Sequence, residues 1–174
     1  MTEAHGLSQS DGYIEDSPLV ETFDSFYMRE FRPVLALANV LVGDRSAAED
    51  LTQEAFVAAF RSWSRLTTPD HWIRSVVSRQ AMSWWRQFYA ARRAMVRSYQ
   101  PESSILEMPV ESEAFWAEVR RLPSRQAQSV ALYYLEDRST DEIAGILGCD
   151  SSTVRIHLSR ARRTLATSLE VADL

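Results

Sequence analysis

Apolar residues that recur every three or four positions are the feature that most constrains this chain. They begin at Leu19 and continue almost to the end, and this spacing places them on one face of successive α-helices. Only 5 glycines and 6 prolines occur in 174 residues, and no alternating apolar stretch is long enough to indicate a strand. The sequence therefore predicts an all-α protein.

Breaks in this periodicity divide the chain into two small helical domains. Residues 1–18 lack periodicity and are predicted to form a disordered tail. Residues 98–112 carry Pro101, Pro109 and several acidic residues, which is typical of a flexible linker. We therefore expect one domain over residues 19–97 and a second over residues 113–169. The polar N-terminus and the lack of an 18-residue apolar run favour a cytoplasmic protein.

The charges are distributed unevenly along the chain. The formal net charge is -5, yet residues 71–101 contain six arginines and no acidic residue. Residues 151–169 contain four more arginines and again no acidic residue. Two basic segments in an otherwise acidic chain indicate two separate contacts with a polyanion.

The second basic segment belongs to a two-helix motif. Ser139-Thr-Asp-Glu142 has the form of a capping box, and Gly148-Cys149-Asp150 forms a turn before the next helix. This arrangement predicts a helix-turn-helix, whose second helix enters the major groove of DNA. We expect that helix to bury Val154, Leu158, Ala161 and Leu165. Its other faces carry Ser151, Ser152, Thr153, Arg155, His157, Arg160, Arg162 and Arg163.

The first basic segment is predicted to be a long helix from about His71 to Arg97, capped by Asp70. Before it, Ser46-Ala-Ala-Glu49 predicts a capping box for a helix from about Ala47 to Trp63. On the long helix we expect Ile73, Val77, Ala81, Trp84 and Phe88 to be buried. Arg79, Arg86 and Arg93 recur every seven residues beside Trp85, which fits either the core or a contact with DNA. Arginines that follow a backbone, beside aromatic rings that stack on bases, are typical of single-stranded DNA binding.

Several segments together resemble the extracytoplasmic-function sigma factors of the sigma-70 family. Residues 47–56, Ala-Ala-Glu-Asp-Leu-Thr-Gln-Glu-Ala-Phe, resemble the region-two helix of this family. Residues 122–126, 142–144, 153–155 and 158–162 resemble its region four, and the resemblance spans roughly residues 19–169 in the family's order. Many members of the family have Arg-Asn followed four residues later by Asp, whereas this chain has Ser78-Arg79 and then Ser83. This departure resembles the sigma-E-like subgroup of actinobacteria. His157 stands where the family usually has a basic residue.

The resemblance implies a subunit that binds RNA polymerase and determines which promoters it recognises. One helix is implied to bind the clamp helices of core polymerase through Asp50, Gln53, Glu54 and Phe56. The minus-10 element is implied to contact Leu66, Arg74, Arg79, Ser83, Trp85, Arg86 and Arg93. The minus-35 element is implied to contact Ser151, Ser152, Thr153, Arg155, His157, Arg160 and Arg162. The implied partners are promoter DNA, the clamp and flap of core polymerase, and an anti-sigma factor.

Two other classes of function remain to be weighed. A conventional helix-turn-helix regulator with a sensing or dimerising N-terminal domain explains the second basic segment but leaves the first unexplained. An enzyme lacks support, because the sequence shows no Gly-rich phosphate loop, metal-ligand cluster or paired catalytic carboxylates. We therefore expect no catalytic residue, metal, cofactor or small-molecule substrate.

Overall fold

The computed structural model describes residues 21–94 and 110–172, and within these ranges it contains helices and no strand. The predicted all-α class is therefore confirmed. The predicted tail, residues 98–109 of the predicted linker and the predicted end of the long helix, residues 95–97, lie outside the described residues. None of the described helices is long and apolar enough to span a bilayer. In chain order the elements are α1 (Phe23–Val42), α2 (Arg45–Ser62), a 3-10 turn η1 (Trp63–Arg65), α3 (Pro69–Ala94), α4 (Val110–Arg121), α5 (Ser124–Tyr134), α6 (Thr140–Leu147) and α7 (Ser151–Ala172).

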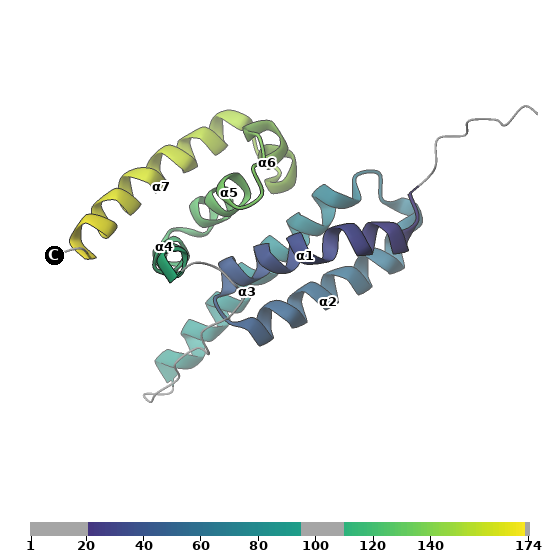
Figure 1. Cartoon of the computed structure of the whole chain (residues 1–174), viewed down its shortest axis with the longest axis horizontal. Coiled ribbons are helices and arrows are strands. Elements are labelled where there is room, and N and C mark those ends of the chain that lie inside the picture. Colours follow the sequence, from purple (N-terminus) through teal and green to yellow (C-terminus); the bar gives the residue numbers. More distant parts are fainter. Residues whose placement is uncertain (1–20, 95–109, 173–174) are drawn as a thin grey trace, which may run out of the picture.

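Helices α1, α2 and α3 form the first domain, in which each helix contacts the other two (Figure 1). Helix α1 runs continuously past Pro33, although proline has no amide hydrogen to donate inside a helix. A cluster of aromatic rings fills one end of this bundle. Its members are Phe23, Phe26, Tyr27, Phe31, Phe56, Phe60 and Trp63.

Two helix starts in this domain differ from the prediction. Asp44, and not Ser46, caps α2, because the Asp44 side chain accepts a 2.8 Å hydrogen bond from the Ala47 amide. Glu49 instead accepts a hydrogen bond from Arg45. Helix α3 begins at Pro69, whose fixed φ suits the first helical position. Asp70 therefore lies within the first turn, where its negative charge interacts favourably with the helix dipole.

Helices α4 to α7 form the second domain. Helix α4 begins at Val110, so the last three residues of the predicted linker are helical. Helices α6 and α7 are the two helices of the predicted helix-turn-helix, and α7 packs against α4, α5 and α6. The predicted buried stripe of α7 is confirmed. Its residues Val154, Leu158, Ala161 and Leu165 are all 5% exposed or less.

The start and the end of α6 follow the sequence prediction closely. Ser139 and Glu142 form a complete capping box, in which the Ser139 amide donates to Glu142 Oε2 over 2.9 Å. Hydrogen bonds from the Ser139 amide, the Ser139 hydroxyl and Arg138 lower the pKa of the Glu142 carboxyl from its ordinary value of 4.5 to about 2. Gly148 ends the helix with a φ of 64°, a left-handed conformation that glycine adopts without strain.

One hydrophobic cluster continues from the first domain into the second. Helices α1 and α3 contribute Leu37, Val40, Leu41, Val42 and Ala81 to it, and the rest comes from α4 to α7. Helix α1 contacts α4 and α5, and α3 contacts α6. The sequence predicted two domains joined by a flexible linker, whereas in this structure the two domains pack against each other.

A close contact between the domains lies at the C-terminal end of α1. Gly43 has a φ of 72°, and a Cβ atom at this position would lie 2.6 Å from Arg120 Nε of α4. The Arg120 guanidinium donates a 3.2 Å hydrogen bond to the Val40 carbonyl. A cation from the second domain therefore lies at the negative end of the α1 dipole.

The capping box predicts the effect of Ser139→Ala. This change removes the hydroxyl that accepts a hydrogen bond from the Glu142 amide. We therefore expect the free energy of unfolding to fall by about 1 kcal/mol. Urea unfolding followed by circular dichroism measures the difference. Ser159→Ala, at an exposed serine inside α7, is the control and should change little. Equal unfolding free energies for Ser139→Ala and the control would contradict the role of the cap.

The lowered pKa of Glu142 predicts a pH dependence. An unfolded glutamate titrates near its ordinary value of 4.5, so the ionised carboxylate stabilises the fold above that pH. This stabilisation is lost as the pH falls from 4.5 towards the folded-state pKa of about 2. We expect wild type and Glu142→Gln to differ in unfolding free energy above pH 5, and to converge in the acid range. Urea unfolding at a series of pH values tests this, and a gap that persists unchanged at pH 2 would be inconsistent with it.

Candidate nucleic-acid interface

The outer surface of α7 is polar and open to the solvent. Ser152, Arg155 and Arg160 are exposed, and Ser151 and Thr153 are partly exposed at the N-terminal end of the helix. The buried stripe turns these residues outward, opposite the contacts with α5 and α6. Helix α7 therefore presents arginines and hydroxyl groups to the solvent, and Arg162 and Arg163 near its middle are exposed as well.

Two of the predicted DNA contacts on α7, Arg162 and His157, interact with or are partly covered by the rest of the protein. The Arg162 guanidinium donates a 2.8 Å hydrogen bond from Nε to the Tyr134 hydroxyl and lies over the ring of Tyr133. His157 is only partly exposed, and its Nδ1 is buried without a hydrogen-bond partner in the described part of the chain. Burial, with the nearby charges of Arg125 and Arg160, lowers the pKa of His157 below its ordinary value, which favours the neutral ring.

Helix α3 carries a second open basic surface. Arg79 and Arg86 are exposed and lie seven residues apart, on the same side of the helix. Ser83 is partly exposed between them and accepts a 3.4 Å hydrogen bond from Gln87. Leu66, just before this helix, is also partly exposed. The side chain of Arg93 lies outside the described residues.

The tryptophans of α3 pack against the protein. The Trp85 indole donates a 2.6 Å hydrogen bond to the Leu41 carbonyl at the end of α1. Trp84 packs against the hydrophobic cluster shared by the two domains, and its ring stacks on Phe88 with centroids 5.0 Å apart. Of the two interpretations left open for Trp85, the structure therefore favours a structural role.

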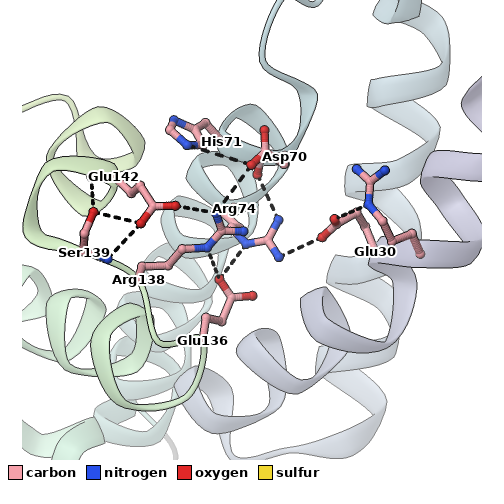
Figure 2. Close-up of polar contacts among 9 residues, drawn as sticks. Glu30, Asp70, His71, Arg74, Glu136, Arg138, Ser139 and Glu142 are labelled. Carbon is pink, nitrogen blue, oxygen red and sulfur yellow. Dashed lines mark hydrogen bonds and ion pairs between the residues drawn. The ribbon is translucent and has the colours of Figure 1, made fainter. Parts of the chain in front are cut away.

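Arg74, which the resemblance implied to contact the minus-10 element, is 3% exposed and faces the other domain (Figure 2). Its Nε donates to Glu136 Oε2 over 2.5 Å, and its Nη2 donates to Glu30 Oε2 over 2.7 Å. Its Nη1 donates to the Asp70 carbonyl. In this conformation Arg74 therefore cannot contact DNA.

Both charges of the Glu30–Arg74 pair are retained in the interior. Burial raises the pKa of the Glu30 carboxyl, but hydrogen bonds from Arg29 and Arg74 outweigh it, and the net pKa lies below the ordinary value. Burial lowers the pKa of the Arg74 guanidinium, but its hydrogen bonds and ion pairs with Glu136 and Glu30 have a larger, opposite effect. The net pKa of Arg74 therefore lies above its ordinary value. The pair remains ionised because each charge meets an opposite one.

Sequence reasoning missed Glu30 and Glu136, although one signal was available. Glu30 lies four residues after Phe26 and four before Val34, in the middle of the apolar stripe of α1. An acidic residue in such a stripe indicates a buried cation partner. The stripe does not reveal that the partner network includes Glu136, which is 62 residues from Arg74.

The four residues of α2 that were implied to bind core polymerase do not all lie on the surface. Asp50, Gln53 and Glu54 are exposed and line a shallow groove together with Val57 and Arg61. Phe56, which was grouped with them, is 3% exposed and packs against Phe26. Phe56 therefore supports this surface from inside the core.

Comparison with known protein families matches both domains. The family model described as Sigma-70 region 2 matches residues 26–100, and the model described as Sigma-70, region 4 matches residues 112–165. The first range contains α2 and α3, and the second contains the helix-turn-helix.

Individual relatives cover most of the chain. The probable RNA polymerase sigma factor RfaY of Xanthomonas campestris is 32% identical over 149 residues, which are 78% of this chain and 37% of that longer protein. The RNA polymerase sigma-E factor of Streptomyces antibioticus is 30% identical over 141 residues, 77% of each chain. The solved sigma factor RpoE of Bartonella quintana, in complex with the anti-sigma factor NepR, has a similar fold, with a TM-score of 0.70 at 20% identity over 86% of this chain and 97% of that one. The chain belongs to the sigma-70 family of RNA polymerase sigma factors, and to its extracytoplasmic-function type.

Proposed function

We propose that this chain binds core RNA polymerase and directs it to promoters through three helices with separate tasks. Helix α2 docks on the polymerase clamp helices, α3 binds the opened minus-10 element, and α7 reads the minus-35 element as a duplex. The helix-turn-helix domain also meets the polymerase flap. The observation that carries this assignment is the outer surface of α7, where Arg155 and Arg160 stay exposed opposite a fully buried stripe.

The chemistry of α7 suits duplex DNA. Arginine pairs with the O6 and N7 atoms of guanine in the major groove, and Arg155 lies one turn from the start of the helix. Ser151, Ser152 and the free amides of the first turn hold phosphate groups. Arg162 lies on the same helix, and its hydrogen bond to the Tyr134 hydroxyl fixes its positive charge for a contact with the DNA backbone.

The chemistry of α3 suits a single strand. Arg79 and Arg86 follow the phosphates along one side of the helix, and the residues from Leu66 to Asp70 lie before its first turn. We assign a flipped base of the non-template strand to this loop. Because the Trp85 indole donates its hydrogen bond to the Leu41 carbonyl, the contact with DNA depends on the arginines more than on this ring.

The remaining partners follow from this assignment. The Bartonella relative was solved with an anti-sigma factor, and we propose that such a partner also restrains this chain. We propose that the chain acts in the cytoplasm, where polymerase and promoters are found, and that it has no catalytic activity of its own. The alternative of a conventional regulator is disfavoured, because the Sigma-70 region 2 model matches the N-terminal domain.

Run-off transcription with core polymerase and genomic DNA tests the proposal. We expect start sites that appear only when the purified chain is added. A chain that fails to join core polymerase, or that joins it without any new start site, would contradict the proposed function.

The division of tasks predicts opposite effects for two arginine variants. Arg155→Ala should weaken binding of the holoenzyme to minus-35 duplex by roughly tenfold, because a bidentate base contact is worth about 1–3 kcal/mol. Arg79→Ala should impair promoter opening more than duplex binding. Filter binding measures the first effect, and permanganate reactivity of unpaired thymines measures the second.

Arg121→Ala is the matched control for both variants, because Arg121 is exposed on α4 and pairs only with Glu118 among the described residues. It should change neither assay. Equal losses in both assays for Arg79→Ala and Arg155→Ala would count against separate tasks.

The acidic surface of α2 predicts that Glu54→Arg weakens binding of core polymerase by about tenfold, because like charges then oppose the basic partner surface. Asp141→Arg, an equal charge reversal on the exposed first turn of α6, should leave core binding nearly unchanged. Fluorescence anisotropy of the labelled full chain titrated with core polymerase measures both. If the two variants bind alike, α2 is not the docking surface.

A further inference from the structure

An isoleucine lies at the centre of the outer surface of α7. Ile156 is 49% exposed. It follows the buried Val154 by two residues, which places it about 200° around the helix axis from Val154. Figure 1 shows α7 on the side of the second domain that faces away from the first. Ile156 therefore points away from the core, and its exposure does not depend on how the two domains pack.

Polar and cationic residues surround Ile156 on this surface. Ser152 and Arg160 lie four residues before and after it, so they are its neighbours on the helix surface, and both are exposed. Arg155 is also exposed, and its Nη2 donates a 3.5 Å hydrogen bond to the Ser151 hydroxyl. A single exposed apolar side chain is common on protein surfaces and by itself assigns no role. The position of Ile156, in the middle of a surface that suits DNA, is what indicates one.

A helix in the major groove brings its outermost residues closest to the base edges. In a helix-turn-helix the N-terminal residues of the second helix contact these edges, and Ile156 is the sixth of the 22 residues of α7. The edges present hydrogen-bond donors and acceptors, and one apolar group, which is the C5-methyl group of thymine. An isoleucine over a donor or acceptor would leave that group without a partner, whereas over a methyl group it buries apolar surface on both sides.

We propose, building on the proposed sigma function, that Ile156 contacts the C5-methyl group of a thymine in the minus-35 element and thereby selects that base. The residues that the family resemblance implied for this element are all polar or charged, and Ile156 is not among them. The arginines of α7 supply contacts to phosphates and to guanine, and Ile156 adds a preference that no hydrogen bond provides. The promoters of this chain therefore carry a thymine where Ile156 meets the groove.

Deoxyuridine tests this contact, because it differs from thymidine only in lacking the C5-methyl group. The probe is the minus-35 duplex of a promoter that the run-off experiment identifies, with each thymine of either strand replaced in turn by deoxyuridine. Filter binding with the full chain in complex with core polymerase measures the affinity. We expect the replacement at one position to weaken binding by about fourfold, the effect of one buried methyl group.

Ile156→Ala should abolish this discrimination. The variant should bind the thymine duplex about fourfold more weakly than wild type does, and should bind the deoxyuridine duplex with the same affinity as the thymine duplex. Because the side chain is exposed and alanine is the better helix former, the variant keeps the fold. Ile156→Val keeps the branch at Cβ and should retain most of the preference for thymine.

Met28→Ala is the matched control, because it removes an exposed aliphatic side chain from α1, in the other domain. It should show the same preference for thymine as wild type. The proposal is overturned if wild type is indifferent to every replacement. It is also overturned if Ile156→Ala weakens binding but remains as sensitive to deoxyuridine as wild type, which would indicate a contact elsewhere on the DNA or on the polymerase.

Failure of this inference is distinguishable from failure of the sigma function. If the sigma function is wrong, wild type yields no start site with core polymerase, and the thymine contact is overturned with it. If only the thymine contact is wrong, wild type transcribes and Arg155→Ala still weakens binding of the minus-35 duplex, but the affinity of wild type does not depend on any thymine methyl group.

Discussion

The buried guanidinium of Arg74 is the constraint on which much of this structure depends. Arg74 is almost completely buried, and an isolated charge in that environment would be strongly destabilising. Glu30 supplies one opposite charge from α1, and Glu136 supplies another from the loop before α6. The ion pairs of this one guanidinium therefore link α1, α3 and the helix-turn-helix domain.

The apolar contacts act in the same direction as these charges. Leu37 and Leu41 of α1 lie in a cluster whose other members come mainly from the second domain. The cluster supplies non-directional stabilisation, whereas the ion pairs and the bond from Gln128 to Ser78 supply geometry. The contact between the two domains is thus held by both kinds of interaction.

Several local features of this fold could be predicted from sequence, although the starts of α2 and α3 were not, and the long-range features could not. The capping box at Ser139, the turn at Gly148 and the buried stripe of α7 depend on residues within a few positions of each other. Arg74 looked like a DNA contact because its basic segment is visible in sequence, while its partner Glu136 lies 62 residues away. The burial of Phe56 was not foreseen, because a family resemblance groups residues by motif and does not distinguish the two sides of a helix.

The close approach at the end of α1 limits which sequences this architecture accepts. Position 43 requires a left-handed backbone, which disfavours side chains on local grounds, and Arg120 of the other domain fills the space that a Cβ would need. These two requirements are independent, so relaxing one does not relieve the other. An alanine at this site that avoided the steric overlap by moving Arg120 would also strip a cation from the last carbonyls of α1. The two halves of the molecule can thus approach this closely only because residue 43 has a hydrogen atom where other residues have a Cβ atom.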